Sequence, residues 1–174
     1  MADRNTQLNI GVIGAGWWAT SAHIPGIIQH GKAHLKAVQN RTKSKSEQVA
    51  RDFGADQAFT DYRELVLNGN VDAVIVSSTP NMHFEHAKFA LEHKKHVLIE
   101  KPMTFTVAES QELCRLAAEN NLQFLVSCPW HYTSHGIEAR RLIKEGELGE
   151  VRMISILMTN PLDKLLKGVN TSPT

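Results

Sequence analysis

Residues 8–19 of the chain read LNIGVIGAGWWA. The first half of this stretch is apolar and is typical of a buried strand, and the second half is a G-x-G-x-x-A pattern that opens a helix. We expect Gly14 to permit a tight turn, Gly16 to let a pyrophosphate approach the backbone, and Ala19 to let the helix pack closely on the sheet. Because a helix N-terminus offers unpaired N–H groups and partial positive charge, the stretch predicts a dinucleotide-binding loop. The alternative is an ordinary glycine turn.

Strand-like and helix-like patterns alternate along the rest of the chain. Strands are predicted at residues 8–13, 34–39, 71–77, 95–99 and 122–127, with a weaker one at 58–59, and helices at residues 17–30, 44–53, 61–68, 81–93 and 107–120. Runs such as Val71–Val76 do not alternate between apolar and polar residues, which is typical of strands covered on both faces. The order of elements therefore predicts an α/β fold with a doubly wound parallel sheet, the Rossmann arrangement. Pro25 should kink or shorten the first helix.

Composition narrows the class of protein. The 174 residues are 42% hydrophobic and 21% charged with a formal net charge of +1, so nothing draws the chain toward nucleic acid or a membrane. No apolar run approaches the ~20 residues of a membrane span, and residues 1–8 lack the apolar core of a signal peptide. Cys114 and Cys128 form no disulfide framework, so we expect two buried small side chains and a cytoplasmic protein. The nine histidines complete no zinc pattern, so no metal is expected.

The end of the second predicted strand bears on the choice of dinucleotide. Residues 38–45 read VQNRTKSK, where an NAD site usually has Asp or Glu to hold the ribose 2′-OH. No carboxylate is present, and Asn40, Arg41 and Lys43 with Thr42 would instead hold a 2′-phosphate by charge and hydrogen bonds. The alternative is a solvated basic loop in which Thr42 or Ser44 caps the next helix. The pattern favours NADP, with NAD as the alternative.

Two further segments follow predicted strands. Residues 77–83 read SSTPNMH and residues 96–103 read HVLIEKPM. Ligands of an open parallel sheet bind at the carboxyl ends of the strands, which is where both segments lie. Pro80 is expected in the first turn of a helix, where its missing N–H costs nothing. Lys101 leaves its strand where an ammonium group would lie near a reacting centre, although an exposed lysine is the simpler interpretation.

Taken together, the motifs resemble a known family. Gly14-Ala-Gly16-Trp-Trp-Ala19, Ser78-Thr-Pro-Asn-Met-His83, Glu100-Lys101-Pro102 and Gly146-Glu-Leu-Gly-Glu-Val151 are similar in order and spacing to the N-terminal part of the Gfo/Idh/MocA family. The resemblance extends over residues 8–158. It implies an NAD(P)-dependent oxidoreductase that acts on a sugar, a cyclitol or a related polyol.

The resemblance also implies roles for single residues. Thr79, Pro80, Asn81 and His83 would line the cofactor cleft, Glu100 would contact the nicotinamide ribose, and Lys101 would bind the reacting hydroxyl and aid proton transfer. The family tends to place substrate-facing side chains where Trp130 and His131 lie, although Trp130 could simply pack and His131 be exposed. Trp17 and Trp18 are large for a phosphate loop, so we expect one to cover the cofactor cleft and the other to pack against a neighbouring layer.

The chain departs from the family in its length. Family members are roughly twice as long, and their second domain carries most of the substrate pocket and a catalytic histidine, usually paired with an aspartate a few residues earlier. We therefore expect a dinucleotide-binding domain at residues 1–128 and the start of an incomplete α+β domain at 129–174. That second part would hold a helix at 134–145 and a first strand from Glu150 to Met158, with no clear order after it.

The chain thus resembles a fragment or truncated product, inactive by itself, of an enzyme that is a homo-oligomer at full length. Two other functions stay open at this point. One is a non-catalytic NADP-binding sensor with the same fold. The other is a different Rossmann enzyme such as a methyltransferase, against which stand Ala19 and the Glu100-Lys101-Pro102 block.

Overall fold

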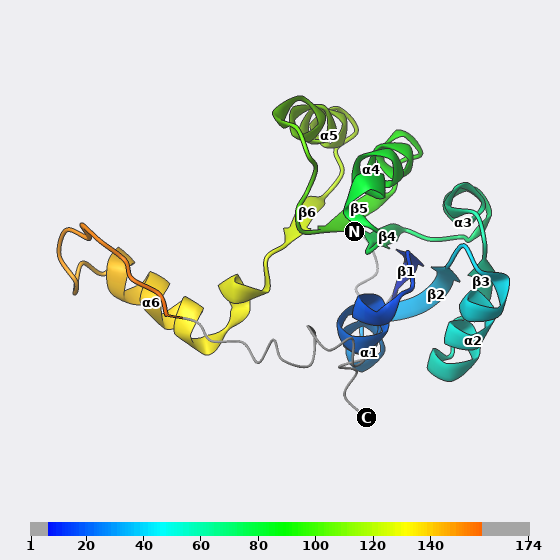
Figure 1. The fold of residues 1–174 in the computed structure, drawn as a ribbon, viewed down its shortest axis with the longest axis horizontal. Helices are drawn as coiled ribbons and strands as arrows, with labels where there is room; N and C mark the ends of the chain where they lie inside the picture. Colours follow the sequence, from blue (N-terminus) through cyan, green and yellow to red (C-terminus); the bar gives the residue numbers. More distant parts are fainter. Residues whose placement is uncertain (1–6, 158–174) are drawn as a thin grey trace, which may run out of the picture. The chain divides into compact units, whose positions relative to one another are not determined.

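The computed structural model describes residues 7–157. The chain divides into two compact units, with the boundary between Ser127 and Cys128. The strands of the first unit are β1 (Leu8–Ile13), β2 (Ala33–Gln39), β3 (Gln57–Phe59), β4 (Ala73–Val76), β5 (His96–Glu100) and β6 (Phe124–Ser127). All neighbouring strands pair in parallel, in the order β3-β2-β1-β4-β5-β6 (Figure 1). The predicted parallel sheet is confirmed, including its short strand at residues 58–59.

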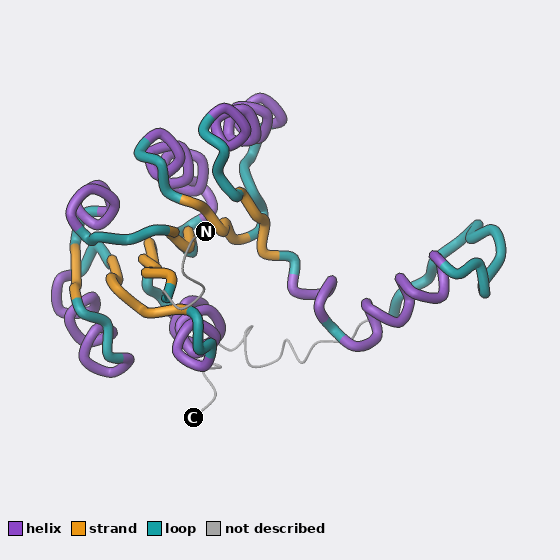
Figure 2. Tube along the Cα trace, turned by 180° about the vertical axis from the view of Figure 1, so that it is seen from behind, coloured by secondary structure: helices purple, strands orange, loops and turns teal. Residues whose placement is uncertain are grey.

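Helices cover both faces of this sheet (Figure 2). They are α1 (Ile24–Gln29), α2 (Lys43–Phe53), α3 (Tyr62–Asn68), α4 (His83–Glu92) and α5 (Val107–Glu119). On one face α3, α4 and α5 bury Leu65, Leu91 and Leu113 against the strands, and on the other α1 buries Ile24 and Ile27. Helices thus bury the apolar side chains on both faces of the sheet, so the apolar runs of the central strands need no alternating polar residues. The predicted doubly wound fold is confirmed.

The irregularity expected at Pro25 takes the form of a widened turn. Helical backbone begins at Trp17, and residues Ala19–His23 form a π-helical turn directly before α1. Proline has no N–H to donate, and its ring clashes with the carbonyl four residues earlier in a regular helix, so a wider turn accommodates it. Ala19, at the start of this turn, is fully buried against the sheet, as its small size predicts.

The strand order creates a crevice beside the end of β1. In the parallel register Ile13 lies between Gln39 of β2 and Val76 of β4, so the loops after these three strands begin side by side. The chain crosses to opposite faces of the sheet on either side of β1, and such a switch point leaves the loops splayed apart. The sequence therefore brings residues 14–16, 40–42 and 77–79 to one edge.

The second unit is described by itself. It holds a 3₁₀ turn at Pro129–Tyr132 and helix α6 (Ser134–Lys144), in which Thr133 caps the N-terminus by accepting a hydrogen bond from the N–H of Gly136. The predicted helix at 134–145 is confirmed. The predicted strand from Glu150 is wrong, because residues 150–157 form no strand, while Met158 and the residues after it lie outside the described residues. Residues 128–157 contain no strand, so the backbone of this apolar run has no ladder partner among the described residues of the unit.

The expected burial of the cysteines is also wrong: Cys114 is exposed and Cys128 is half-buried. On α5 it is Leu113 and Ala117 that face the sheet, and the next residue after Leu113 is turned about 100° away around the helix. Among residues 7–157, no helix combines the length and apolar character needed to cross a membrane. Over the same range no three His, Cys, Asp or Glu side chains gather where they would hold a metal ion.

Candidate functional site

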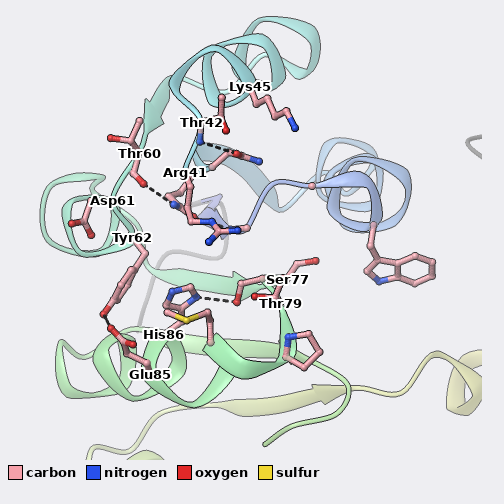
Figure 3. Close-up of a pocket in the computed structure, with 18 of the residues that line it drawn as sticks. Arg41, Thr42, Lys45, Thr60, Asp61, Tyr62, Ser77, Thr79, Glu85 and His86 are labelled. Atoms are coloured by element: carbon pink, nitrogen blue, oxygen red, sulfur yellow. Dashed lines mark hydrogen bonds between the residues drawn. The ribbon is translucent and has the colours of Figure 1, made fainter. Parts of the chain in front are cut away.

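A cleft of about 740 Å³ lies at the carboxyl edge of the sheet, in the crevice beside β1. Four segments line it: the glycine loop after β1, the loop after β2, residues 60–63 after β3, and residues 77–86 after β4. Figure 3 shows Arg41 and Thr42 on one side of this space and Ser77, Thr79 and His86 on the other. Loops after four parallel strands thus converge on one concave site, which is where this fold binds ligands.

Gly14 and Gly16 lack a side chain for different reasons. Gly14 has a φ of +81°, and a Cβ there would lie 2.5 Å from the backbone nitrogen and Cα of Ser78, so the chain itself demands glycine. A Cβ on Gly16 would meet nothing closer than its contact of 3.9 Å with the carbonyl oxygen of Gly14. The space beside Gly16 is open toward the cleft, so its missing side chain leaves room for a ligand group and fits a diphosphate.

Two amide side chains at the end of β2 brace the surrounding loops. Gln39 is buried, accepts a hydrogen bond from the Gly14 N–H at 3.0 Å, and donates to the carbonyl of Thr60 at 2.8 Å. Asn40 donates to the carbonyl of Ala15 at 3.0 Å and accepts from the Thr42 N–H at 3.0 Å. The sequence analysis found Asn40 but missed Gln39. Its only signal was a polar residue at the end of a buried strand.

The basic residues after β2 separate into two groups. Arg41, Thr42 and Lys45 line the cleft, whereas Lys43 does not line it and its side chain is 79% exposed, with its Nζ 3.8 Å from Glu47. Lys43 and Lys45 are two positions apart in α2, so they project from nearly opposite sides of the helix. Within residues 7–157, neither Arg41 nor Lys45 has an acidic side chain within 4.0 Å.

Residues that the sequence analysis missed form the far wall of the cleft. The hydroxyl of Tyr62 donates to Glu85 at 2.6 Å, and the guanidinium of Arg63 donates to the same oxygen at 2.7 Å (Figure 3 shows the tyrosine contact). The bond from Tyr62 and the charge of Arg63 hold the pKa of Glu85 below its usual value. Arg63 is therefore neutralised locally, unlike Arg41.

The first turn of α4 adds a neutral histidine to this wall. Burial lowers the pKa of His86 to about 4, and its Nδ1 lies 2.9 Å from the hydroxyl oxygen of Ser78. The imidazole also lies against the ring of Tyr62, with centroids 4.2 Å apart. Because this ring is uncharged near neutral pH, it and the ring of Tyr62 add an uncharged aromatic surface beside the Arg63–Glu85 ion pair.

The segment after β4 is only partly in the cleft. Thr79 and Pro80 line it, and Pro80 begins a 3₁₀ turn that leads into α4, as expected. Asn81 is exposed and is not among the lining residues. His83 is 1% exposed, with Nδ1 2.7 Å from the carbonyl oxygen of Pro102 and Nε2 3.0 Å from that of Ser78, so it ties together the loops after β4 and β5.

A smaller cavity of about 340 Å³ adjoins the cleft. It is lined by Trp17, Trp18, Ser77, Ser78, Pro80, His83, Glu100 and Lys101. Both tryptophans line the larger cleft as well, and they are 52% and 40% exposed, so the expectation that one packs into a neighbouring layer is wrong. Lys101 is exposed beside the buried Glu100, where its ammonium group is available to a ligand.

Trp130 and His131 lie in the second unit, on the exposed 3₁₀ turn at Pro129–Tyr132. The ring of Trp130 packs against that of His135, with centroids 5.5 Å apart. Their predicted role toward a substrate stays a prediction.

Comparison with known proteins gives a consistent result. A family model described as an oxidoreductase family with an NAD-binding Rossmann fold matches residues 8–128. An uncharacterised oxidoreductase of Synechocystis is 31% identical over 153 residues, which are 88% of this chain and 41% of the relative. A dTDP-3,4-didehydro-2,6-dideoxy-α-D-glucose 3-reductase of Saccharopolyspora spinosa is 33% identical over 155 residues, 88% of this chain and 46% of the relative.

Solved structures agree with the fold. A 3-ketoreductase of Actinomadura kijaniata, in complex with TDP-benzene and NADP, is 26% identical with a TM-score of 0.77 and covers 84% of this chain and 46% of its own. An apo scyllo-inositol dehydrogenase of Lactobacillus casei has a TM-score of 0.79 at 23% identity, over 84% of this chain and 44% of its own, and it supports the fold alone. The chain thus spans less than half the length of these relatives.

Proposed function

The chain belongs to the Gfo/Idh/MocA oxidoreductase family and carries its NAD-binding Rossmann fold, and we propose that the cleft beside β1 binds NADP. The observation that carries this proposal is the charge at the end of β2. Arg41 and Lys45 face the cleft with no acidic partner in the described residues, and Asn40 stands where an NAD site has a carboxylate. Two cations at that point suit a 2′-phosphate, which only NADP carries.

The rest of the cleft fits the remainder of a dinucleotide. The open side of Gly16 would receive the diphosphate at the start of the helix, and the neutral wall of Tyr62 and His86 suits an adenine ring. Thr79 and Pro80 would line the path toward the smaller cavity, between Trp18 and Lys101. The bound nicotinamide would supply hydride transfer.

Lys101 is the residue that we propose for the chemistry. Its ammonium group would donate a hydrogen bond to the reacting hydroxyl or carbonyl oxygen and help to move the hydroxyl proton. The substrate class is a sugar, a cyclitol or a related polyol. Support comes from the similarity to a nucleotide-sugar 3-reductase, at 33% identity. Trp130 and His131 are proposed to face that substrate.

A titration of the purified 174-residue chain with NADPH and with NADH tests the cofactor. Trp17 and Trp18 line the cleft, so their fluorescence should be quenched as the reduced nicotinamide binds. We expect NADPH to bind more tightly, and Arg41→Ala to remove about 1.5–3 kcal/mol from NADPH binding and much less from NADH binding. Equal losses for both dinucleotides would mean that Arg41 does not read the phosphate.

The same sample tests the chemistry. We propose that these residues by themselves bind NADP without dehydrogenating sugars or polyols, because Lys101 is the only proposed catalytic group among them. Loss of one positioned acid or base typically costs about 10²–10⁴-fold. Turnover by a longer form that is abolished by Lys101→Ala would exclude the alternative of a non-catalytic NADP-binding module. Robust turnover by the 174-residue chain would contradict the proposed roles.

A further inference from the structure

The carboxylate of Glu100 is occupied by hydrogen bonds from within the chain. Its Oε1 accepts from the indole Nε1–H of Trp18 at 2.8 Å and lies 2.8 Å from Nε2 of His23. Its Oε2 accepts from the backbone N–H of Lys101 at 3.1 Å. Burial would raise the pKa of Glu100, but these hydrogen bonds outweigh it and leave the pKa below its usual value.

The hydrogen bonds that Glu100 accepts determine the tautomer of His23 and indicate the role of the carboxylate. An ionised carboxylate only accepts hydrogen bonds and has about four lone-pair positions, so His23 must carry its proton on Nε2. The side chains of His23 and Glu100 are only 11% and 8% exposed, so the pair is held away from water. Trp18, His23 and the Lys101 N–H thus take three of the about four acceptor positions of the carboxylate.

These donors come from separate segments of the first unit. Trp18 follows the glycine loop, His23 lies five residues later at the end of the π-helical turn, and Lys101 leaves the sheet at the end of β5. The carboxylate therefore joins the loop that would hold the diphosphate to the backbone of the proposed catalytic lysine. Trp18 and Lys101 also both line the smaller cavity.

We infer that Glu100 is a positioning residue, which fixes Trp18 and the backbone of Lys101 around the smaller cavity. This inference rests on the proposed function, and the ribose contact that the family resemblance implied for Glu100 stays a prediction beside it. His23 is the second anchor of the same carboxylate. Their effect falls on the nicotinamide half of the dinucleotide, since the adenosine half would bind in the larger cleft.

Two ligands separate this role from a general structural one. NADPH would reach the smaller cavity, whereas adenosine 2′,5′-bisphosphate ends before it. We expect Glu100→Gln to raise the Kd of NADPH roughly tenfold, because a buried bond to a charged group is lost. The Kd of the bisphosphate should change by less than about twofold. Glu119→Gln, which removes an exposed carboxylate paired with Arg115, should alter neither value.

A second pair of variants tests the other anchor. His23→Gln should weaken NADPH binding in the same selective way, while His30→Gln, an exposed position just after α1, should not. If Glu100→Gln or His23→Gln weakens both ligands equally, the role is structural and the inference is overturned. An unchanged NADPH Kd in both variants overturns it as well.

The indole resonance of Trp18 provides a readout that needs no ligand. In a ¹⁵N–¹H spectrum the Trp18 signal is assigned by its absence in Trp18→Phe. In Glu100→Gln it should shift upfield, because its acceptor has lost its charge, and in Glu119→Gln it should stay in place. A Trp18 signal that does not respond to Glu100→Gln overturns the anchoring. If the unaltered chain binds neither NADPH nor the bisphosphate, the proposed function fails, whatever the resonance shows.

Discussion

The two ends of the cleft treat their charged side chains differently. At the end of β2, Arg41 and Lys45 face the open space without an acidic partner in the described residues. At the end of β5, Glu100 is buried and receives hydrogen bonds from Trp18 and His23. Among the described residues, the charge thus has no counter-ion at one end and is held by hydrogen bonds from the chain at the other.

This difference separates recognition from positioning. An exposed cation without a partner loses little by staying in water and gains a charge-assisted bond when an anion arrives. A buried carboxylate that accepts several hydrogen bonds from the chain holds its donors in place, and removing one donor would leave it partly unsatisfied at a cost of about 1–3 kcal/mol. On the proposed function, residues of the first kind would contact the cofactor, and those of the second kind hold other residues in place.

The glycine loop lies between the two ends, and its two glycines give the largest expected contrast. Gly14→Ala should lower the free energy of unfolding by about 3–5 kcal/mol, because the new Cβ meets the Ser78 backbone at 2.5 Å and φ is +81°. Gly16→Ala should change it by less than about 0.5 kcal/mol, since its Cβ meets no atom closer than 3.9 Å. Urea unfolding measures both values.

NADPH binding completes the comparison. Gly16→Ala should weaken it without loss of stability, because the methyl group would fill the space proposed for the diphosphate. If Gly16→Ala lowers the free energy of unfolding as much as Gly14→Ala does, both glycines are structural. The missing side chain of Gly16 would then no longer support a diphosphate position. If Gly16→Ala binds NADPH normally, the diphosphate lies elsewhere.

Most of the fold could be predicted from the sequence because its signals are local. The buried runs of β1 and β4 lack polar alternation, and the glycine pattern places the switch from strand to helix. The strand predicted from Glu150 failed for the opposite reason. A strand is stable only when its backbone N–H and C=O groups have hydrogen-bond partners on a neighbouring strand. An apolar stretch of sequence does not indicate whether such a neighbour is present.

The site was predictable only where one residue type implies one chemistry. Gly14 is such a residue, because its φ of +81° and its contact with Ser78 require glycine, whereas the phosphate contact of Arg41 stays a prediction. Gln39 and His23 were missed, since their importance lies in partners 25 and 77 residues away, Gly14 and Glu100. The different placement of Lys43 and Lys45 could have been predicted from the sequence. Once Thr42 is taken as the N-cap of the helix, these two lysines must point to opposite sides of it.

His86 is a third type of group in the cleft, buried and neutral, unlike the exposed cations after β2 and the buried carboxylate of Glu100. The pKa of His86 is about 4 because of burial, against an ordinary 6.5 in the unfolded chain. The unfolded state therefore takes up a proton first as pH falls, so stability is complete above 6.5 and is lost toward 4. Between pH 7 and 5 this loss amounts to about 2 kcal/mol.

Urea unfolding at both pH values measures it. His86→Gln should lose much less stability over this interval than the unaltered chain, and the exposed His30→Gln should lose as much as the unaltered chain. The same pH dependence in His86→Gln would show that His86 is not the group that titrates.

The smallest expected effect concerns which lysine reads the 2′-phosphate. Lys45→Ala should weaken NADPH binding by about 1 kcal/mol, or roughly fivefold in Kd, because an exposed cation contributes modestly to an ion pair. Lys43→Ala removes the same charge from the same end of α2 but from a side chain that does not line the cleft, so we expect a smaller loss. NADH binding should be unchanged in both variants. Equal losses of NADPH affinity would mean that the two lysines act only through the overall field of the loop, and the unpaired charge at this end would then attract the cofactor without contacting its phosphate.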